Sequence, residues 1–224
     1  VAGLSAESAK AIVAAREQGA FLDVQDLAAR AGLDAGQLRR LAEADALSAL
    51  VGHRRDAAWQ VSGLHLQGDL FDAVAAPEAR VAFQVPSLGE DLVADYASLG
   101  MSLRPHPLSL LRDRLAQRRF LPASAAQQAG DRALARVAGI VTCRQKPGSA
   151  KSVFVTLEDE TGMLNVIVHP WLAERQRCEL LGARLLGVFG QLQSESGVVH
   201  LIAKRLVDLS SWLGRLDTTS RDFH

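Results

Sequence analysis

The first 62 residues carry apolar side chains at the three- and four-residue spacing of amphipathic helices. Each helical run begins behind a residue that commonly caps a helix N-terminus: Ser5, Asp23 or Asp34. Leu38 and Leu41 lie on one side of the last run, which leaves its other side polar. The pattern predicts that residues 1–62 form a compact unit of short helices.

Between residues 131 and 210 the period changes to two, the period of a half-buried strand. The runs predict strand, strand, strand, helix, strand, strand, with turns at "ETG" and "SESG". This is the order of an OB-fold, a five-stranded Greek-key barrel. Gly139, Gly187 and Gly190 stand where such a small barrel must bend sharply.

Residues 63–130 show no sustained period and mix glycine, proline and acidic residues, which predicts a connector. Within it, "SLRPHPLSLLRDRLAQRRFL" predicts a basic helix after two prolines, whose arginines form either a solvated face or phosphate contacts. Residues 211–224 are a C-terminal tail. The predicted fold class is multi-domain α + β: a helical unit at 1–62, a linker, and an OB-fold barrel at 131–210.

The run "KSVFVTLEDETGMLNVIVHP" places a phenylalanine where a core pattern has no room for one. If Val153 and Val155 point inward, the period of two turns Phe154 outward, and it also turns Asn165 outward beside Leu164. OB-folds hold single-stranded nucleic acid on this outer face and on the loop between the first two strands. Phe154 is then placed to stack on a base and Asn165 to hydrogen-bond a base edge. The alternative is that Phe154 packs beneath the connector or the tail.

The loop beside this face, "CRQKPGSAK", concentrates positive charge. Arg144, Lys146 and Lys151 are candidates to contact phosphates, and Gln145 to assist them. The chain as a whole has 25 basic and 25 acidic residues, which argues against a general polyanion binder. The balance is acidic over residues 1–100, with 8 basic and 14 acidic side chains, and basic after residue 100. Any nucleic-acid contact is therefore expected to be local and to favour the C-terminal half.

Cysteine usage and hydropathy limit the remaining classes. Cys143 and Cys178 have neither CxxC spacing nor histidine partners, so we expect free thiols and no metal site. No apolar run approaches the roughly 18 to 20 residues that span a bilayer, and no signal peptide opens the chain. These features predict a soluble cytoplasmic protein with no membrane partner. Val1 stands directly against a motif that needs a helix before it, so we expect a piece of a longer protein.

The segment "VAGLSAESAKAIVAAR" is similar to the second half of a helix-hairpin-helix motif, in which a glycine turn opens a helix. The unpaired amides and the positive end of such a helix make an anion site, which here comprises Gly3, Leu4 and Ser5. The motif usually has a second glycine where Ser5 stands. The alternative is an ordinary capped helix. "AGLDAGQLRRLAEADAL" is similar to a second, degenerate copy with a structural role.

The connector contains "QGDLF", in which Gln67, Leu70 and Phe71 resemble the short peptide by which bacterial polymerases grip the sliding clamp. In such peptides two apolar side chains fill a pocket and the glutamine sets the register. The alternative is that Leu70 and Phe71 fix a linker onto a neighbouring domain.

Four segments together are similar to the C-terminal third of bacterial C-family DNA polymerases, most of all the error-prone relatives of the polymerase III alpha subunit: "GLSAESAKAIVAAR", "GMSLRPHPLSLLRDRL", "RVAGIVTCRQKPGSAKSVFVTLEDETGMLNVIVHP" and "TTSRDFH". That family places tandem helix-hairpin-helix motifs, a clamp-binding peptide and an OB-fold, in this order, after its catalytic domains. The three pieces found here follow the same order.

The resemblance implies a parent enzyme, a DNA-directed DNA polymerase, that copies damaged template with magnesium ions held by acidic residues upstream. For the segment itself it implies no catalytic residue and no cofactor. "LEDE" at 157–160 is expected to be a solvated turn. The segment is then a DNA-handling region that binds duplex and single-stranded DNA. The alternatives are a protein-docking region for the sliding clamp or companion mutagenesis proteins, and an anticodon-binding barrel of a tRNA synthetase.

Overall fold

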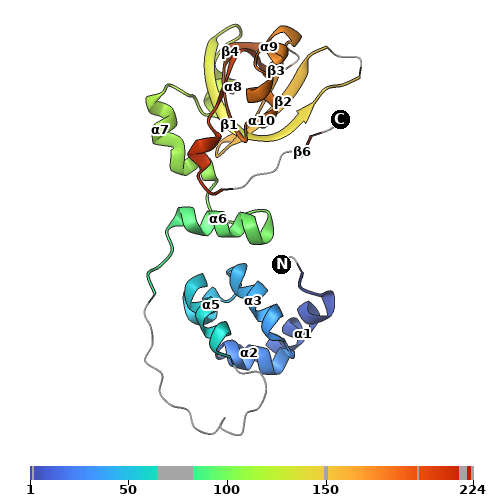
Figure 1. Cartoon of the computed structure of the whole chain (residues 1–224), viewed down its shortest axis with the longest axis vertical. Helices are drawn as coiled ribbons and strands as arrows, with labels where there is room; N and C mark the ends of the chain where they lie inside the picture. The colour runs from blue at the N-terminus through green and yellow to red at the C-terminus, as the bar shows by residue number, and fades with distance from the viewer. Residues whose placement is uncertain (2, 65–82, 149–150, 196, 217–220, 223–224) are drawn as a thin grey trace. The chain divides into compact units, whose positions relative to one another are not determined.

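The computed structural model describes residues 1, 3–64, 83–148, 151–195, 197–216 and 221–222. The chain divides into two compact units, Val1–Ser102 and Leu103–His224 (Figure 1). The boundary falls inside the stretch predicted as a connector, so the two ends of that stretch belong to different units. Within the described ranges, no helix combines the length and the hydrophobicity needed to cross a membrane.

The first unit is built from short helices, as the sequence predicts. Ser5, Asp23 and Asp34 each cap a helix by accepting a hydrogen bond from the amide three residues on. Buried leucine, valine and alanine side chains of four helices and the turns between them form one core, and the short helix that contains Leu50 and Val51 packs against it. The helices are α1 (Ala6–Glu17), α2 (Val24–Ala31), α3 (Ala35–Glu43), α4 (Ser48–Val51), α5 (Arg54–Gly63) and α6 (Leu88–Leu99).

Ion pairs join α6 to α5. Arg54 at the start of α5 donates to Asp91 Oδ1 at 3.1 Å and also to the carboxylate of Asp95, which is buried. The other oxygen of Asp95 accepts from Ser102 Oγ at 2.6 Å. A buried carboxylate is tolerated only with partners of this kind. The helical unit therefore extends through residue 102.

The second unit is a closed barrel. Antiparallel β1–β2, β2–β3, β4–β5 and β1–β4 pairs and a parallel β3–β5 pair join five strands in the circuit β1-β2-β3-β5-β4-β1. This confirms the predicted OB-fold, and the strands wind around a common interior in Figure 1. The strands are β1 (Leu134–Gln145), β2 (Val153–Asp159), β3 (Gly162–Val168), β4 (Leu185–Glu195), β5 (Val198–Asp208) and the short β6 (Arg221–Asp222), which pairs with β1.

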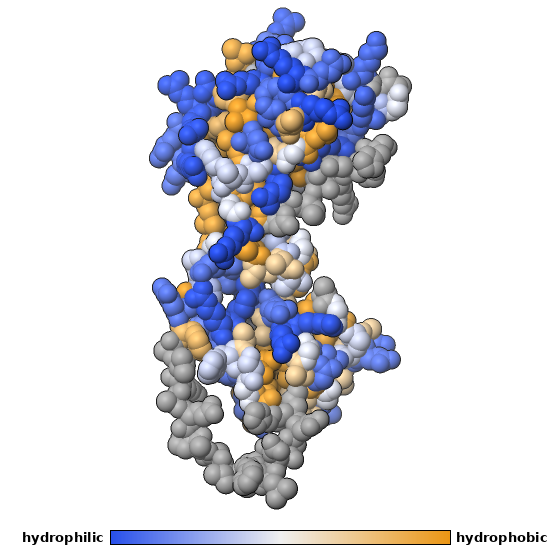
Figure 2. Space-filling view, in the orientation of Figure 1, coloured by the Kyte–Doolittle hydropathy of each residue, from blue (hydrophilic) through white to orange (hydrophobic). Residues whose placement is uncertain are grey.

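Short helices precede, interrupt and follow the barrel strands along the sequence. Before β1 come η1 (Pro107–Leu111), α7 (Arg112–Gln117) and α8 (Ala123–Gln128), and η2 (Ser210–Leu213) follows β5. Between β3 and β4 lie α9 (Pro170–Arg175) and α10 (Arg177–Gly182). Figure 2 shows hydrophilic side chains over much of the visible face of this unit, with hydrophobic ones between them.

Close backbone approach explains two of the glycines in the strands. A Cβ on Gly139 would lie 2.8 Å from the Cβ of Leu157, and one on Gly190 would lie 2.3 Å from the carbonyl oxygen of Ile202. Gly190 also stands beside a bulge, because the β4–β5 register shifts between Phe189 and Gly190. Gly190 thus stands at an irregular point of β4, and Gly139 allows β1 and β2 to approach closely.

Asp159 corrects one expectation from the sequence. The "LEDE" segment was expected to be a solvated turn, but Asp159 is buried at the end of β2. Its carboxylate accepts from Arg112 at 3.0 Å, from the amide of Ala123 at 2.8 Å and from Thr161 Oγ1 at 2.6 Å. Asp159 therefore ties α7 and α8 to the barrel.

The basic helix has structural partners as well. The guanidinium of Arg114 lies 3.8 Å from the ring centroid of Trp212 in η2, and that of Arg118 lies 5.2 Å from the same ring. Arg112 pairs with Asp159 and Glu160. Four arginines follow the two prolines: Arg112, Arg114 and Arg118 contact their own unit in this way, and Arg119 makes none of these contacts.

His106 gives a pH-dependent prediction. Burial lowers the pKa of its imidazole, and this outweighs the opposite effect of Glu158, Glu160 and Asp159. The unfolded chain then takes up the proton at a higher pH than the folded chain, so the free energy of unfolding should fall as pH drops below about 6.5. An NMR titration of the full chain should give His106 a midpoint below that value, and a midpoint above it would contradict this account.

Candidate nucleic-acid interface

The predicted hairpin contact lies at the start of α1. Gly3 has a φ of 76°, in the left-handed region, and Ser5 accepts from the amide of Ser8 at 3.0 Å. Helix geometry leaves the amides of Ala6 and Glu7 without an acceptor inside α1, and both residues are exposed. Open amides at a helix N-terminus attract anions. The geometry is therefore that of an anion site, although Glu7 adds a negative charge to the same turn.

An arginine that sequence reasoning missed reaches this turn. The guanidinium of Arg40 in α3 donates to the carbonyl oxygen of Gly3. A Cβ on Gly3 would lie 2.8 Å from Nη1 of Arg40, so the glycine leaves room for it. Arg40 is exposed and places a positive charge beside the open amides. No signal in the sequence indicates this contact, because Gly3 lies in the turn before α1 whereas Arg40 belongs to α3.

The second hairpin copy repeats the geometry of the first. Gly32 has a φ of 62°, Leu33 is buried, and Asp34 accepts from the amide of Gln37 at 2.8 Å. Gln37 completes a capping box and also donates to Ser8 Oγ at 2.8 Å. The two turns are thus tied together by a side-chain hydrogen bond. This contact accounts for a structural role of the second copy.

On the barrel, side-chain parity places the predicted residues on the outer face. Val155 and Leu164 are buried, whereas Phe154 is half-buried and Asn165 is exposed. Asn165 lies opposite Thr156, whose hydroxyl donates to its Oδ1 at 3.2 Å. This leaves the amide NH2 group of Asn165 available as a donor.

Three neighbours that sequence reasoning did not name widen this face. Phe154 lies opposite Ile167, and Ile167 lies beside Ile202 of β5. His200 lies beside Asn165, and its Nδ1 is buried without a hydrogen-bond partner among the described residues. We define the β2–β3 face as the outer side chains of these strands and their β5 neighbours: Phe154, Thr156, Asn165, Ile167, His200 and Ile202.

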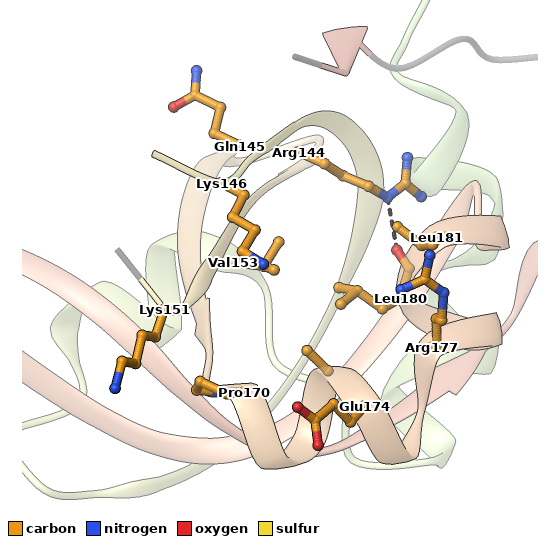
Figure 3. Close-up of a pocket in the computed structure, with 11 residues that line it drawn as sticks. Arg144, Gln145, Lys146, Lys151, Val153, Pro170, Glu174, Arg177, Leu180 and Leu181 are labelled. Carbon is orange, nitrogen blue, oxygen red and sulfur yellow. Dashed lines mark hydrogen bonds between the residues drawn. The ribbon is translucent and has the colours of Figure 1, made fainter. Parts of the chain in front are cut away.

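A pocket of about 400 Å³ adjoins the loop between β1 and β2 (Figure 3). Lys146 and Lys151 from the loop and Arg177 from α10 line it, over apolar side chains that include Val153 and Leu180. Figure 3 shows the side chain of Gln145 directed away from the other lining residues. Glu174 of α9 adds one carboxylate, so the pocket combines three accessible cations and one acid with apolar side chains.

Arg144 does not fit the role predicted for it. It is only 7% exposed, and its Nε donates to the carbonyl oxygen of Leu180 at 2.7 Å, as the dashed line in Figure 3 marks. Its guanidinium also donates to the carbonyl oxygen of Ala183. Arg144 thus satisfies carbonyls at the end of α10. These donors join β1 to the end of α10 and are not free for phosphates.

The predicted clamp-binding residues Gln67, Leu70 and Phe71 lie outside the described residues. The structure therefore adds nothing to that prediction.

The amino-acid sequence is similar to known proteins along its whole length. Residues 1–57 match the family described as "Helix-hairpin-helix motif". The chain is 61% identical over 225 residues to the error-prone DNA polymerase of Azoarcus sp. (strain BH72), and 60% identical over 226 residues to that of Dechloromonas aromatica (strain RCB). Each match covers 100% of the chain. The chain is homologous to one segment of the error-prone DNA polymerases.

The family resemblance inferred from the sequence is thereby confirmed. The chain spans 21% of the length of the Azoarcus error-prone DNA polymerase and 22% of the Dechloromonas one. Among solved structures, asparaginyl-tRNA synthetase from Pyrococcus horikoshii is 18% identical over 45% of this chain and 24% of its own, with a TM-score of 0.36. A TM-score this low does not establish a shared fold.

Proposed function

We propose that this chain is a DNA-handling region of an error-prone DNA polymerase. It binds DNA beside a catalytic core that belongs to the rest of the enzyme. The parent enzyme is a DNA-directed DNA polymerase that copies damaged template in the cytoplasm with magnesium ions bound in that core. The similarity of the whole chain to proteins named error-prone DNA polymerase supports this proposal.

The hairpin at Gly3, Leu4 and Ser5 binds a phosphate of duplex DNA. Support comes from the open amides at the start of α1 and from the guanidinium of Arg40 beside Gly3. Because Glu7 repels anions in the same turn, the phosphate approaches from the side of Gly3 and Arg40. This contact fixes the position of the duplex and reads no sequence.

The β2–β3 face binds single-stranded template. Phe154 stacks on a base, the amide of Asn165 donates to a base edge, and Lys146 and Lys151 contact phosphates. Gln145 assists them from the loop. The observation that carries this proposal is the outward position of Phe154 beside a cationic loop on a closed five-stranded barrel.

A binding measurement with the full chain tests the barrel contact. Phe154→Ala should weaken binding to a fluorescent oligothymidine by about 5- to 150-fold, since one base stacked on an aromatic ring is worth about 1–3 kcal/mol. Leu103→Ala is the matched control, because Leu103 is 93% exposed in the same unit and precedes η1, outside the barrel strands. Fluorescence anisotropy at fixed salt gives both affinities.

Two further variants separate the contacts. Lys146→Gln with Lys151→Gln should make the salt dependence of single-strand binding shallower by about 1.4 in log–log slope, since each phosphate contributes about 0.7. Arg40→Gln should weaken duplex binding and leave single-strand binding unchanged. If Phe154→Ala and the lysine pair both leave single-strand binding at the control level, the β2–β3 face does not bind DNA.

A further inference from the structure

A second cationic surface lies on the other strands of the barrel. The register places Arg136 of β1 and Arg205 of β5 directly opposite Phe189 of β4, one on each side. The two guanidinium carbons lie 5.0 and 5.5 Å from the centroid of the Phe189 ring. The ring itself packs edge-on against Phe120, with centroids 5.6 Å apart. Phe189 is thus a fixed aromatic platform between two arginines.

The charge around this platform is all of one sign. Arg119 and Lys204 line the same hollow, of about 500 Å³, together with Arg136 and Phe189, and no carboxylate of the described residues lines it. We define the Phe189 face as Phe189 with its four cations Arg119, Arg136, Lys204 and Arg205. All four cations are exposed, and within the described ranges none of them forms an ion pair.

The positive surface continues beyond the Phe189 face. Lys204 and Arg205 also line a neighbouring hollow of about 440 Å³, to which α9 contributes Arg175 and the half-exposed ring of Trp171. Glu179 is the single carboxylate among the side chains that line this second hollow. The cations therefore extend from Arg136 on β1, through Lys204 and Arg205 on β5, to Arg175 on α9, and this surface includes the rings of Phe189 and Trp171.

Like charges held this close repel one another unless an anion lies between them. A guanidinium stacked on a ring also keeps its N–H edge free to bind a phosphate. The chain as a whole is neutral, with 25 basic and 25 acidic residues, so this concentration is a local feature. A row of cations with aromatic platforms fits a chain of regularly spaced phosphates better than a single small anion.

We propose that the Phe189 face is a second contact surface for the phosphate backbone of DNA. It lies on β1, β4 and β5, whereas the proposed template contact uses β2 and β3. The five β-strands close into one circuit. A DNA strand that contacts both surfaces therefore passes around the outside of the barrel. This inference goes beyond the proposed function, because the β2–β3 face can bind DNA with or without it.

The salt dependence of binding tests the proposal on the full chain. With an oligothymidine of about 30 nucleotides, longer than the roughly 4–16 nucleotides that one OB-fold face covers, both surfaces are engaged. Arg136→Gln with Arg205→Gln should make the slope of log affinity against log salt shallower by about 1.4, because each single-strand phosphate contributes about 0.7. Arg136→Lys with Arg205→Lys keeps both charges and should keep the slope.

The matched control is Arg132→Gln with Arg215→Gln, which removes two exposed arginines outside the Phe189 face. It should leave the slope unchanged. An equal change in the control, or no change in Arg136→Gln with Arg205→Gln, overturns the proposal. If only the Lys146 and Lys151 variants lower the slope, the proposed function stands and the Phe189 face is not part of it.

A measurement on the unaltered chain guards against misfolded variants. Phenylglyoxal modifies accessible arginines, and mass spectrometry reads the extent at each position. Bound oligothymidine should lower the modification of Arg136 and Arg205 at least about threefold relative to that of Arg132, as expected of guanidinium groups covered by phosphates. Equal modification with and without DNA overturns the proposal, whatever else binds this surface.

Discussion

Replacing Asp159 with alanine is expected to lower the free energy of unfolding of the barrel unit by about 3 kcal/mol or more. The carboxylate is buried and accepts from Arg112, from the amide of Ala123 and from Thr161. Without it, the amide of Ala123 loses its acceptor inside the protein, and Arg112 loses one of its two carboxylates. The amide of Ala123 then bears a desolvation cost that no group inside the protein offsets, and Arg112 keeps only its pair with Glu160.

Hydrogen exchange followed by mass spectrometry on the full chain reports the barrel separately from the helical unit. Peptides from α8, β2 and β3 should exchange faster in Asp159→Ala. Asp113→Ala is the matched control, since Asp113 is exposed in α7 and should change stability by no more than about 0.5 kcal/mol. Asp159→Asn keeps one oxygen acceptor and should fall between the two. Equal exchange in the Asp159 and Asp113 variants would contradict the structural role of Asp159.

The alternation of apolar and polar residues along the sequence was sufficient to predict most of the barrel. Strands β2 and β3 follow the period of two without interruption, so the positions of Val155, Leu164 and Asn165 could be predicted correctly. Glycine at position 190 marked a real irregularity of β4, where the register with β5 shifts and only a residue without Cβ fits against the Ile202 carbonyl. The helix caps at Ser5 and Asp34 could also be predicted, because a cap depends on residues only three positions apart.

Arg144 shows where that alternation misleads. Val137 and Val141 point inward on β1, and continued alternation would turn residue 144 outward. The β1–β2 register shifts between Val141 and Cys143, so the parity of the strand reverses there. Arg144 then lies opposite Val155, which is buried, and its guanidinium reaches the carbonyls of α10. A bulge of this kind leaves no mark in the residue pattern.

Long-range contacts account for the other differences. The partners of Asp159 and the approach of Arg40 to Gly3 join segments that lie far apart in the sequence, and only the folded chain brings them together. The Phe189 face has the same origin, since its ring and its two flanking arginines come from three strands. A signal existed in β4, where the buried Val188 turns Phe189 outward. The sequence does not show that Arg136 and Arg205 lie on either side of this ring, because that depends on how β1 and β5 pair with β4.

Gly190→Ala is expected to destabilise the barrel by about 3 kcal/mol or more, at or beyond the upper end of the usual cost of overpacking. The added Cβ would lie 2.3 Å from the carbonyl oxygen of Ile202 and 3.0 Å from Cδ1 of Leu201. The first of these atoms is backbone in the paired strand β5, so it cannot turn away as a side chain can. Relief requires β4 and β5 to separate at the bulge between Phe189 and Gly190.

Gly130→Ala is the matched control, because a Cβ at Gly130 would meet no atom within 4 Å. That change should leave the barrel as stable as before or more stable by up to about 1 kcal/mol, since alanine restricts the unfolded chain. Hydrogen exchange of β4 and β5 peptides in the full chain should therefore accelerate in Gly190→Ala alone. Similar exchange in both variants would show that β4 and β5 can separate here at little cost. The platform of Phe189, next to Gly190 on β4, would then be less firmly held than the strand pairing indicates.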